Sequence, residues 1–260
     1  MSRSWIAATL GALALAGCAS STTSNTSGGT SAGKPNLTVS AASSLRSAFT
    51  TYAQQFSQAS LRYSFAGSDI LAAQIEQGIK PDIFASANTK YPDQLYAKGL
   101  VAKPVVFAAN KLVIAVPANS TKIRAVSDLE KPGVTIAIGA AAVPIGSYTR
   151  EVLARLGATA SHRILGNVRS EEAEVTGIVG KLTQGAVDAG FTYVTDVRAT
   201  NGILKAIPLP ALLQPAVAYG IAVVKGSKHQ ARAQAFISGL LSGAGQADLL
   251  KAGFLPAPAG

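Results

Sequence analysis

From Asn36 onward, short apolar runs alternate with segments of helical spacing, and this alternation limits what the chain can fold into. The strands predicted from the apolar runs are Leu37–Ser40, Leu61–Phe65, Asp82–Ala85, Lys111–Val116, Val134–Ile138, Ala189–Tyr193, Leu204–Pro208 and Tyr219–Val224. The helices predicted from the periodic segments are Leu45–Phe56, Ile70–Gln77, Lys90–Lys98, Ser147–Leu156, Glu171–Gln184 and His229–Leu241. Glycines that suit left-handed helix ends follow several of them, at Gly78, Gly99, Gly157 and Gly185. Such alternation is typical of an α/β architecture with largely parallel sheets.

Two continuous apolar strands, Lys111–Pro117 ("KLVIAVP") and Tyr219–Val224 ("YGIAVV"), lie far apart in the chain and enclose a self-contained α/β pattern. This arrangement predicts one lobe inserted into another, with the chain crossing twice along these strands. The predicted first lobe comprises residues 36–115 and 201–260, and the inserted second lobe comprises residues 116–200. Ligands of α/β proteins bind beyond the carboxyl ends of strands and often between lobes.

The N-terminus has the pattern of an export signal rather than of a folded segment. Arg3 precedes the apolar stretch Ile6–Gly17, which is too short to span a membrane. The sequence Leu-Ala-Gly-Cys that ends at Cys18 resembles a bacterial lipoprotein signal, and Cys18 is the only cysteine. We therefore expect residues 1–17 to be a signal peptide and residues 18–35 to be a flexible tether. The tether would hold an extracytoplasmic domain on the bacterial membrane through a lipid on Cys18.

The composition argues against several functional classes. The formal net charge is +10, but the basic residues are scattered, so we do not expect nucleic-acid binding. The chain has only two histidines, His162 and His229, which is too few for a Cys/His metal cluster. It has no G-x-S-x-G elbow between a predicted strand and a predicted helix, and it lacks the G-x-x-x-x-G-K-[ST] and G-x-G-x-x-G motifs. These features favour a binding protein over an enzyme, with no cofactor and no protein-ligated metal cation.

Small and hydroxyl-bearing residues recur where a predicted strand leads into a helix. Ser43 and Ser44 occupy the first such junction, in "LTVSAASSLRSAF". Simple helix capping is the plain explanation, but Ser68, Pro144 and the segment Ser170–Leu182 mark three similar junctions. Helix starts present unpaired N–H groups and partial positive charge, which favour anions. The pattern therefore predicts that four helix N-termini converge on one anion.

The chain resembles the molybdate-binding component of bacterial ABC importers, a class II extracytoplasmic solute-binding protein. The stretches that carry the resemblance are "LTVSAASSLRSAF", "SFAGSDILAAQI", "KPDIFASAN", "NKLVIAVP", "VPIGSYTREVL" and "GKLTQGAVDAGFTYVTD". The resemblance implies a two-lobe periplasmic-binding-protein fold that closes around molybdate, and around tungstate as well. It also implies a membrane permease as partner and a monomeric receptor.

The same resemblance implies the residues that hold the ion. By their places in the matching stretches, Ser44 and Ser68 correspond to serine ligands, and Ile145 and Val175 correspond to backbone N–H donors. Tyr193 corresponds to a tyrosine that donates its hydroxyl. Three further residues are expected beside the ion rather than on it, namely Ser43, Asp69 and Glu174.

Acidic residues beside the expected ligands leave the choice of anion open. Asp69 follows Ser68 directly, and a carboxylate in the pocket would repel a dianion or accept a proton from hydrogen phosphate. The favoured interpretation places Asp69 in solvent, where it stabilises its helix start. Three alternatives remain: the same fold with phosphate, sulfate or an organic anion, a surface hydrolase with Ser44 or Ser68 as nucleophile, and a ligand-free adhesion lipoprotein.

Overall fold

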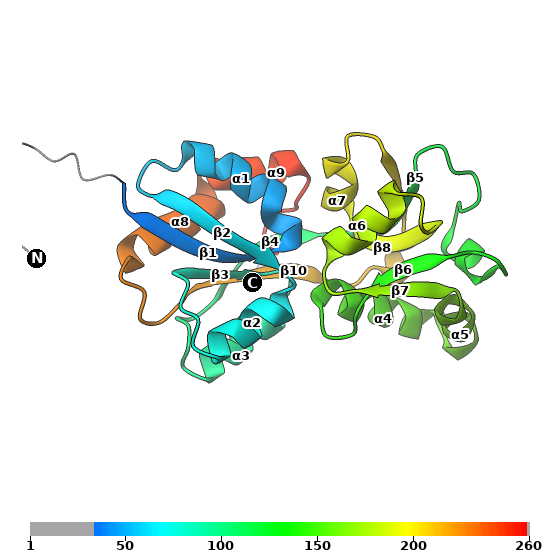
Figure 1. Cartoon of the computed structure of the whole chain (residues 1–260), viewed down its shortest axis with the longest axis horizontal. Helices are drawn as coiled ribbons and strands as arrows, with labels where there is room; N and C mark the ends of the chain where they lie inside the picture. Colours follow the sequence, from blue (N-terminus) through cyan, green and yellow to red (C-terminus); the bar gives the residue numbers. More distant parts are fainter. Residues whose placement is uncertain (1–33, 259–260) are drawn as a thin grey trace, which may run out of the picture. The chain divides into compact units, whose positions relative to one another are not determined.

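A computed structural model describes residues 34–258. The predicted signal peptide, Cys18 and nearly all of the predicted tether lie outside the described residues. Within residues 34–258, ten strands form two five-stranded sheets (Figure 1). The strands are β1 (Asn36–Ala42), β2 (Ser60–Ala66), β3 (Ile83–Ser86), β4 (Val105–Asn110), β5 (Leu112–Pro117), β6 (Ile136–Gly139), β7 (Val168–Glu172), β8 (Ala189–Tyr193), β9 (Leu204–Pro208) and β10 (Val217–Val223).

Helices connect most of these strands. The α-helices are α1 (Arg46–Gln55), α2 (Ser68–Glu76), α3 (Lys90–Ala97), α4 (Pro144–Leu156), α5 (Ala158–Gly166), α6 (Val175–Thr183), α7 (Val194–Ala199), α8 (Gln230–Ser242) and α9 (Ala244–Ala252). Short 3-10 turns occur at η1 (Ser43–Leu45), η2 (Val126–Glu130) and η3 (Ala211–Leu213). The four glycines predicted at helix ends all adopt positive φ, so those predictions are confirmed.

The two sheets have the same strand order and direction. The first sheet is ordered β2-β1-β3-β10-β4, and the second is ordered β7-β6-β8-β5-β9. In each sheet four strands run in one direction, and only β10 or β5 runs against them. The prediction of an α/β fold with two mostly parallel sheets is confirmed. We call each sheet with its flanking helices a lobe.

The chain passes between the lobes at two points, but not along the strands that the sequence suggested. β5 and β10 each lie wholly within one sheet, and the crossings precede them, at Lys111 and at residues 209–216. Because β5 and β9 pair with each other in the second sheet, sheet membership assigns residues 112–208 to the second lobe. The lobe boundaries predicted at 115/116 and 200/201 differ from this division by four and eight residues.

Helices cover both faces of each sheet. Figure 1 shows α1, α8 and α9 on one face of the first sheet and α2 and α3 on the other. In the second lobe, α6 and α7 lie on one face and α4 and α5 on the other. Aromatic side chains pack in the first lobe, where the rings of Phe49 and Phe236 meet edge to face with their centroids 5.5 Å apart. These packed layers hold the strand-to-helix turns rigidly at the junction between the lobes.

Equivalent polar clamps lie near the starts of β1 in the first lobe and β6 in the second. In the first lobe, Asp82 accepts hydrogen bonds from the backbone N–H and the hydroxyl of Thr38, at 2.7 and 2.8 Å. In the second lobe, Asp188 accepts the same pair from Thr135, each at 2.8 Å. The shared topology and the shared clamp relate β1 to β6 and β3 to β8.

Candidate functional site

A small cavity lies between the two lobes, at the turns that follow the sheet strands. It offers about 10 Å³ to the centre of a water-sized sphere, which is about the space that one water molecule needs. The lining residues are all uncharged, namely Ala42, Ser43, Ser44, Ala66, Gly67, Ser68, Ala87, Val143, Pro144, Ile145, Val175 and Tyr193. The structure therefore brings together all five predicted ligand residues, with Ser43 beside them.

The first lobe contributes two buried hydroxyls. Ser44 lies in η1, directly after β1, and Ser68 begins α2, directly after β2. Neither hydroxyl caps its helix, so the plain capping interpretation is wrong. The Ser68 hydroxyl oxygen instead accepts the backbone N–H of Ala87 at 3.1 Å. Because that bond uses only the oxygen, the Ser68 proton stays available to a ligand.

A hydrogen-bond chain supports Ser44 from behind. The Ser44 hydroxyl lies 3.0 Å from the hydroxyl of Tyr219 on β10. The Asn110 side-chain amide donates to the Tyr219 oxygen at 3.4 Å and to the Thr195 hydroxyl at 2.9 Å. An amide N–H can only donate, so the Tyr219 oxygen accepts from Asn110 and the Tyr219 hydroxyl can donate a hydrogen bond to the Ser44 oxygen. The Ser44 proton is then available to a ligand in the cavity. The sequence contains no local signal that would have linked Tyr219 or Asn110 to this site.

The second lobe contributes two helix N-termini. Pro144 is the first residue of α4, where its missing N–H costs nothing. The first intrahelical donor of α4 is Ser147, whose N–H bonds to Val143 at 3.0 Å. The N–H of Ile145, the second residue of α4, therefore has no helical partner, and neither does the N–H of Val175, the first residue of α6. Both residues are buried, and they line the cavity from the second lobe, while the serines line it from the first.

Tyr193 completes the donor set at the end of β8. Its side chain is 1% exposed, and its hydroxyl is buried without any hydrogen-bond partner among the described residues. Burial, together with the neighbouring Tyr219, raises the pKa of Tyr193 well above its ordinary value. The hydroxyl therefore stays protonated and can act as a donor. Its backbone N–H bonds to the Asp196 carboxylate at 2.9 Å, which fixes Tyr193 at the start of α7.

The lobes touch directly beside the cavity. A Cβ atom added to Gly67 would lie 2.5 Å from the carbonyl oxygen of Ala173 in the other lobe, so only glycine fits there. The Tyr91 hydroxyl of α3 donates to the carbonyl of Ala142 across the same junction. These contacts describe two lobes that meet around the cavity.

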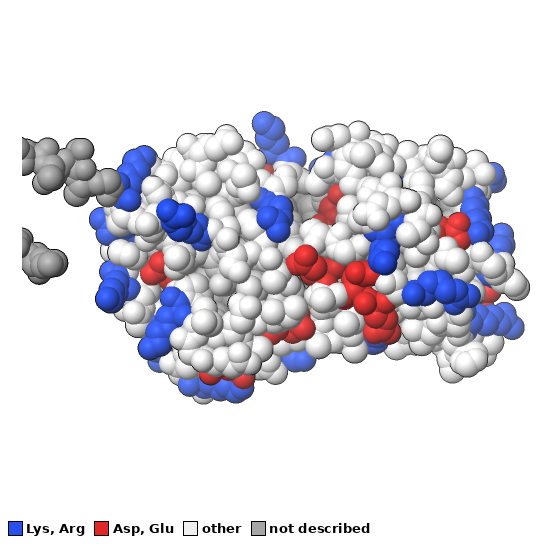
Figure 2. All heavy atoms as spheres, viewed as in Figure 1, with Lys and Arg blue, Asp and Glu red and all other residues white. Residues whose placement is uncertain are grey.

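Two acidic residues flank the cavity without lining it. One carboxylate oxygen of Asp69 and one of Glu174 are buried and have no hydrogen-bond partner among residues 34–258. The interpretation that Asp69 points into solvent is therefore wrong, because its Oδ1 lies against Gly67, 2.7 Å from the place of a Cβ. Figure 2 shows acidic side chains gathered over the junction of the lobes on the face in view.

Other kinds of site find little support in the part of the chain that the structure describes. No group of three or more His, Cys, Asp or Glu side chains there could hold a metal ion. His162 and His229 are absent from the cavity lining, so neither serves Ser44 or Ser68 as a base there. Within residues 34–258, every helix is too short or too polar to cross a membrane. The arrangement is suited to holding a small anion that carries only acceptor atoms.

Comparison with known proteins defines the class of this fold. The chain superposes on the periplasmic molybdate-binding protein of Azotobacter vinelandii with a TM-score of 0.74, at 23% identity over 84% of this chain and 98% of that chain. The two five-stranded sheets therefore form a periplasmic-binding-protein fold.

Sequence comparison narrows the class to a family. The family model of bacterial extracellular solute-binding proteins matches residues 37–255, so the chain belongs to this family, as predicted. It is 35% identical to the molybdate-binding protein ModA of Mycobacterium bovis, over 92% of each chain. It is also 29% identical, again over 92% of each chain, to a Bacillus subtilis protein, YvgL, named as an ABC transporter substrate-binding lipoprotein.

Proposed function

We propose that this protein captures molybdate outside the cytoplasm and delivers it to the permease of an ABC importer. Relatives named as molybdate-binding proteins match between 74% and 92% of the chain, which supports this ligand. The observation that carries the proposal is the Tyr193 hydroxyl, a buried donor without a partner in a cavity lined by no charged side chain. A tetrahedral dianion would supply the missing acceptor.

In this proposal Ser44, Ser68 and Tyr193 donate hydroxyl protons to the ion, and Ile145 and Val175 donate backbone N–H groups. Each hydrogen bond to a charged group contributes about 1.5–3 kcal/mol net. Five such bonds, less the cost of closing the lobes, correspond to submicromolar affinity. Since the donors come from both lobes, the bound ion would stabilise the closed arrangement by a hinge motion at the two crossings.

The donor set also bears on selectivity. Molybdate and tungstate are fully deprotonated near neutral pH, so a cavity with donors on every side suits both ions. Hydrogen phosphate carries a proton that needs an acceptor, and the unpartnered oxygens of Asp69 and Glu174 lie next to the cavity. Phosphate is therefore the second candidate, favoured only if one of these carboxylates reaches the ion.

The remaining features of the proposal concern location and partners. A lipid on Cys18 would anchor the protein to the membrane, and residues 19–35 would let it reach the permease. The receptor would act as a monomer, without a cofactor and without catalysing a reaction.

Titration calorimetry with molybdate, tungstate, sulfate and phosphate tests the ligand. We expect submicromolar binding of molybdate and tungstate and no heat with phosphate. The Asp69→Asn variant tests whether the Asp69 carboxylate accepts the proton of hydrogen phosphate. We expect no detectable phosphate binding by this variant either. If the wild type binds phosphate and the Asp69→Asn variant does not, phosphate replaces molybdate as the proposed ligand. Absence of binding to all four ions would refute both.

A further inference from the structure

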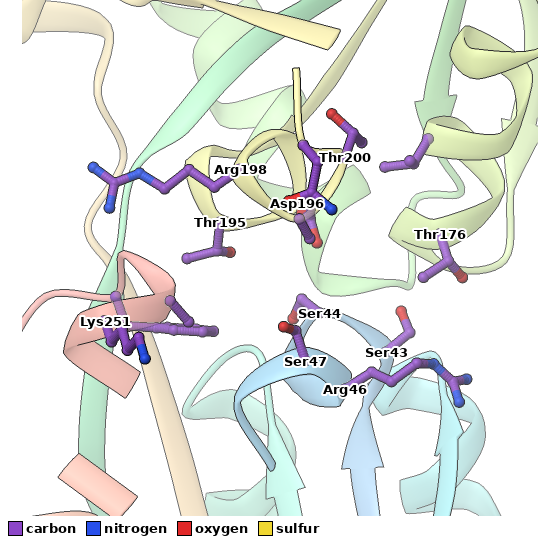
Figure 3. Close-up of a pocket in the computed structure, with 15 residues that line it drawn as sticks. Ser43, Ser44, Arg46, Ser47, Thr176, Thr195, Asp196, Arg198, Thr200 and Lys251 are labelled. Carbon is purple, nitrogen blue, oxygen red and sulfur yellow. The ribbon is translucent and has the colours of Figure 1, made fainter. Parts of the chain in front are cut away.

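A second and larger cavity lies on the other side of Ser43 and Ser44. Its volume is about 460 Å³, within the range of small-molecule sites. Its walls are α1 and α9 of the first lobe and α6 and α7 of the second (Figure 3). We call it the basic groove. Because Ser43 and Ser44 line both spaces, the basic groove directly adjoins the smaller cavity, which we call the donor cavity after the five predicted donors that line it.

Three cations line the basic groove, namely Arg46 of α1, Arg198 of α7 and Lys251 of α9. None of them takes part in the ion pairs formed among the described residues. The Arg46 guanidinium lies over the Phe65 ring, 4.4 Å from its centroid, which leaves its N–H donors unpaired. In Figure 3, Arg198 and Lys251 lie on one side of Ser44 and Ser47, and Arg46 lies on the other.

Arg198 and Lys251 come from opposite lobes. The Arg198 guanidinium rests on Gly253, where an added Cβ would lie 2.5 Å from its Nη1. Gly253 follows α9, two residues after Lys251, and has a φ of +98°. The carbonyl end of α9 lies against the Arg198 guanidinium and offsets part of its charge. Two cations from opposite lobes nevertheless line one space, and an anion there would interact favourably with both.

The acidic residue in the lining, Asp196, does not neutralise these cations. Its carboxylate is buried and accepts the backbone N–H of Tyr193. Burial raises the pKa of Asp196 to about 7, so a large fraction is uncharged at neutral pH. The basic groove therefore keeps an excess of positive charge.

The donor cavity itself cannot attract an ion from a distance, because its hydroxyl and amide dipoles act only at short range. Asp69 and Glu174, which flank it, repel anions. We propose that the basic groove is an encounter site, a second and weaker site for the tetrahedral dianion that precedes its transfer past Ser44 into the donor cavity. This proposal rests on the proposed function.

Stopped-flow tyrosine fluorescence with sodium molybdate tests the encounter site. Tyr193 and Tyr219 lie in and beside the cavity and supply the signal. We expect the Arg198→Gln/Lys251→Gln double variant to slow association at low salt by about tenfold, at the lower end of electrostatic steering effects. Its dissociation rate should change less than about twofold, and its association rate should lose most of the salt dependence of the wild type.

The matched control removes the same charges elsewhere. Lys228 and Arg232 are exposed and do not line the groove; Lys228 lies just before α8, and Arg232 lies in its first turn. The Lys228→Gln/Arg232→Gln variant should associate within about twofold of the wild-type rate. Equal association rates for the two double variants, or an effect on dissociation alone, would overturn the encounter site. A wild type that binds no molybdate would instead overturn the proposed function.

Discussion

The Tyr193→Phe variant separates ligand binding from folding most sharply. The Tyr193 hydroxyl is buried and makes no hydrogen bond within the described residues. Removing it deletes a donor to the ion but no contact of the ligand-free protein. The lost charge-assisted hydrogen bond amounts to about 1.5–3 kcal/mol, which is about tenfold to a hundredfold in Kd. The free energy of unfolding without ligand should stay equal or rise, because an unpaired polar group no longer has to be buried.

Titration calorimetry and urea unfolding measure the two effects on one preparation. Tyr63→Phe is the matched control, since the Tyr63 hydroxyl donates to the carbonyl of Phe49 at 2.9 Å and lies outside the cavity. This control should lose about 1 kcal/mol of stability and keep wild-type affinity for molybdate. If Tyr193→Phe binds molybdate as the wild type does, Tyr193 does not donate to the ion, and the proposed ligand set is wrong.

Three further predictions concern neighbouring groups. Ser68→Ala should weaken molybdate by about tenfold to a hundredfold in calorimetry, and it should also lower unfolding free energy by about 1 kcal/mol, because the N–H of Ala87 loses its acceptor. Gly67→Ala should weaken molybdate at least as much as Ser68→Ala, because its Cβ would meet the carbonyl of Ala173 on closure; wild-type affinity would contradict the close approach of the lobes. Asp196 has a folded pKa of about 7, above its unfolded value of 3.8, so its contribution to stability is complete below pH 3.8 and is lost as pH rises to about 7. Urea unfolding at several pH values should show the unfolding free energy of the wild type falling relative to that of Asp196→Asn between those limits, by up to about 1.4 kcal/mol per pH unit. If the two proteins change in parallel with pH, the raised pKa of Asp196 is refuted.

Local patterns in the sequence predicted the elements that bury a continuous apolar face. The eight strands predicted from apolar runs all have counterparts, because buried sheet strands need consecutive apolar residues. β7 (Val168–Glu172) escaped prediction, since its outer side chains are polar and its two glutamates resemble a helix start. The predicted helix from Glu171 consequently begins later, at Val175. The edge strand β4 and the helices α5, α7 and α9 were not predicted either.

The candidate site, like the fold, could be predicted only in part from local sequence patterns. Ser44, Ser68, Ile145, Val175 and Tyr193 belong to local motifs, and the structure places all of them on one cavity. Asn110 and Tyr219 lie far from these motifs in sequence, and only the pairing of β10 with β4 brings them to Ser44. The burial of one Asp69 oxygen against Gly67 was not predicted, because a helix-start carboxylate is ordinarily expected in solvent. Sequence motifs therefore indicated the donors, and tertiary contacts determine what supports and surrounds them.

The likeness of the two lobes explains why the donors meet. With β1 equivalent to β6 and β2 to β7, the turn at Ser44 corresponds to the turn at Ile145, and the turn at Ser68 corresponds to the turn at Val175. Each lobe thus presents the same two strand-to-helix turns, and the cavity forms where the two pairs face each other. The sequence has no visible repeat, because a helix start donates through its backbone whatever side chain it carries. In the first lobe, the two turns themselves carry side-chain hydroxyls, on Ser44 and Ser68. In the second lobe, the side-chain hydroxyl comes instead from Tyr193, at the end of β8. Substitutions at Ile145 or Val175 that keep the helix start intact should therefore affect the anion far less than substitutions at the two serines.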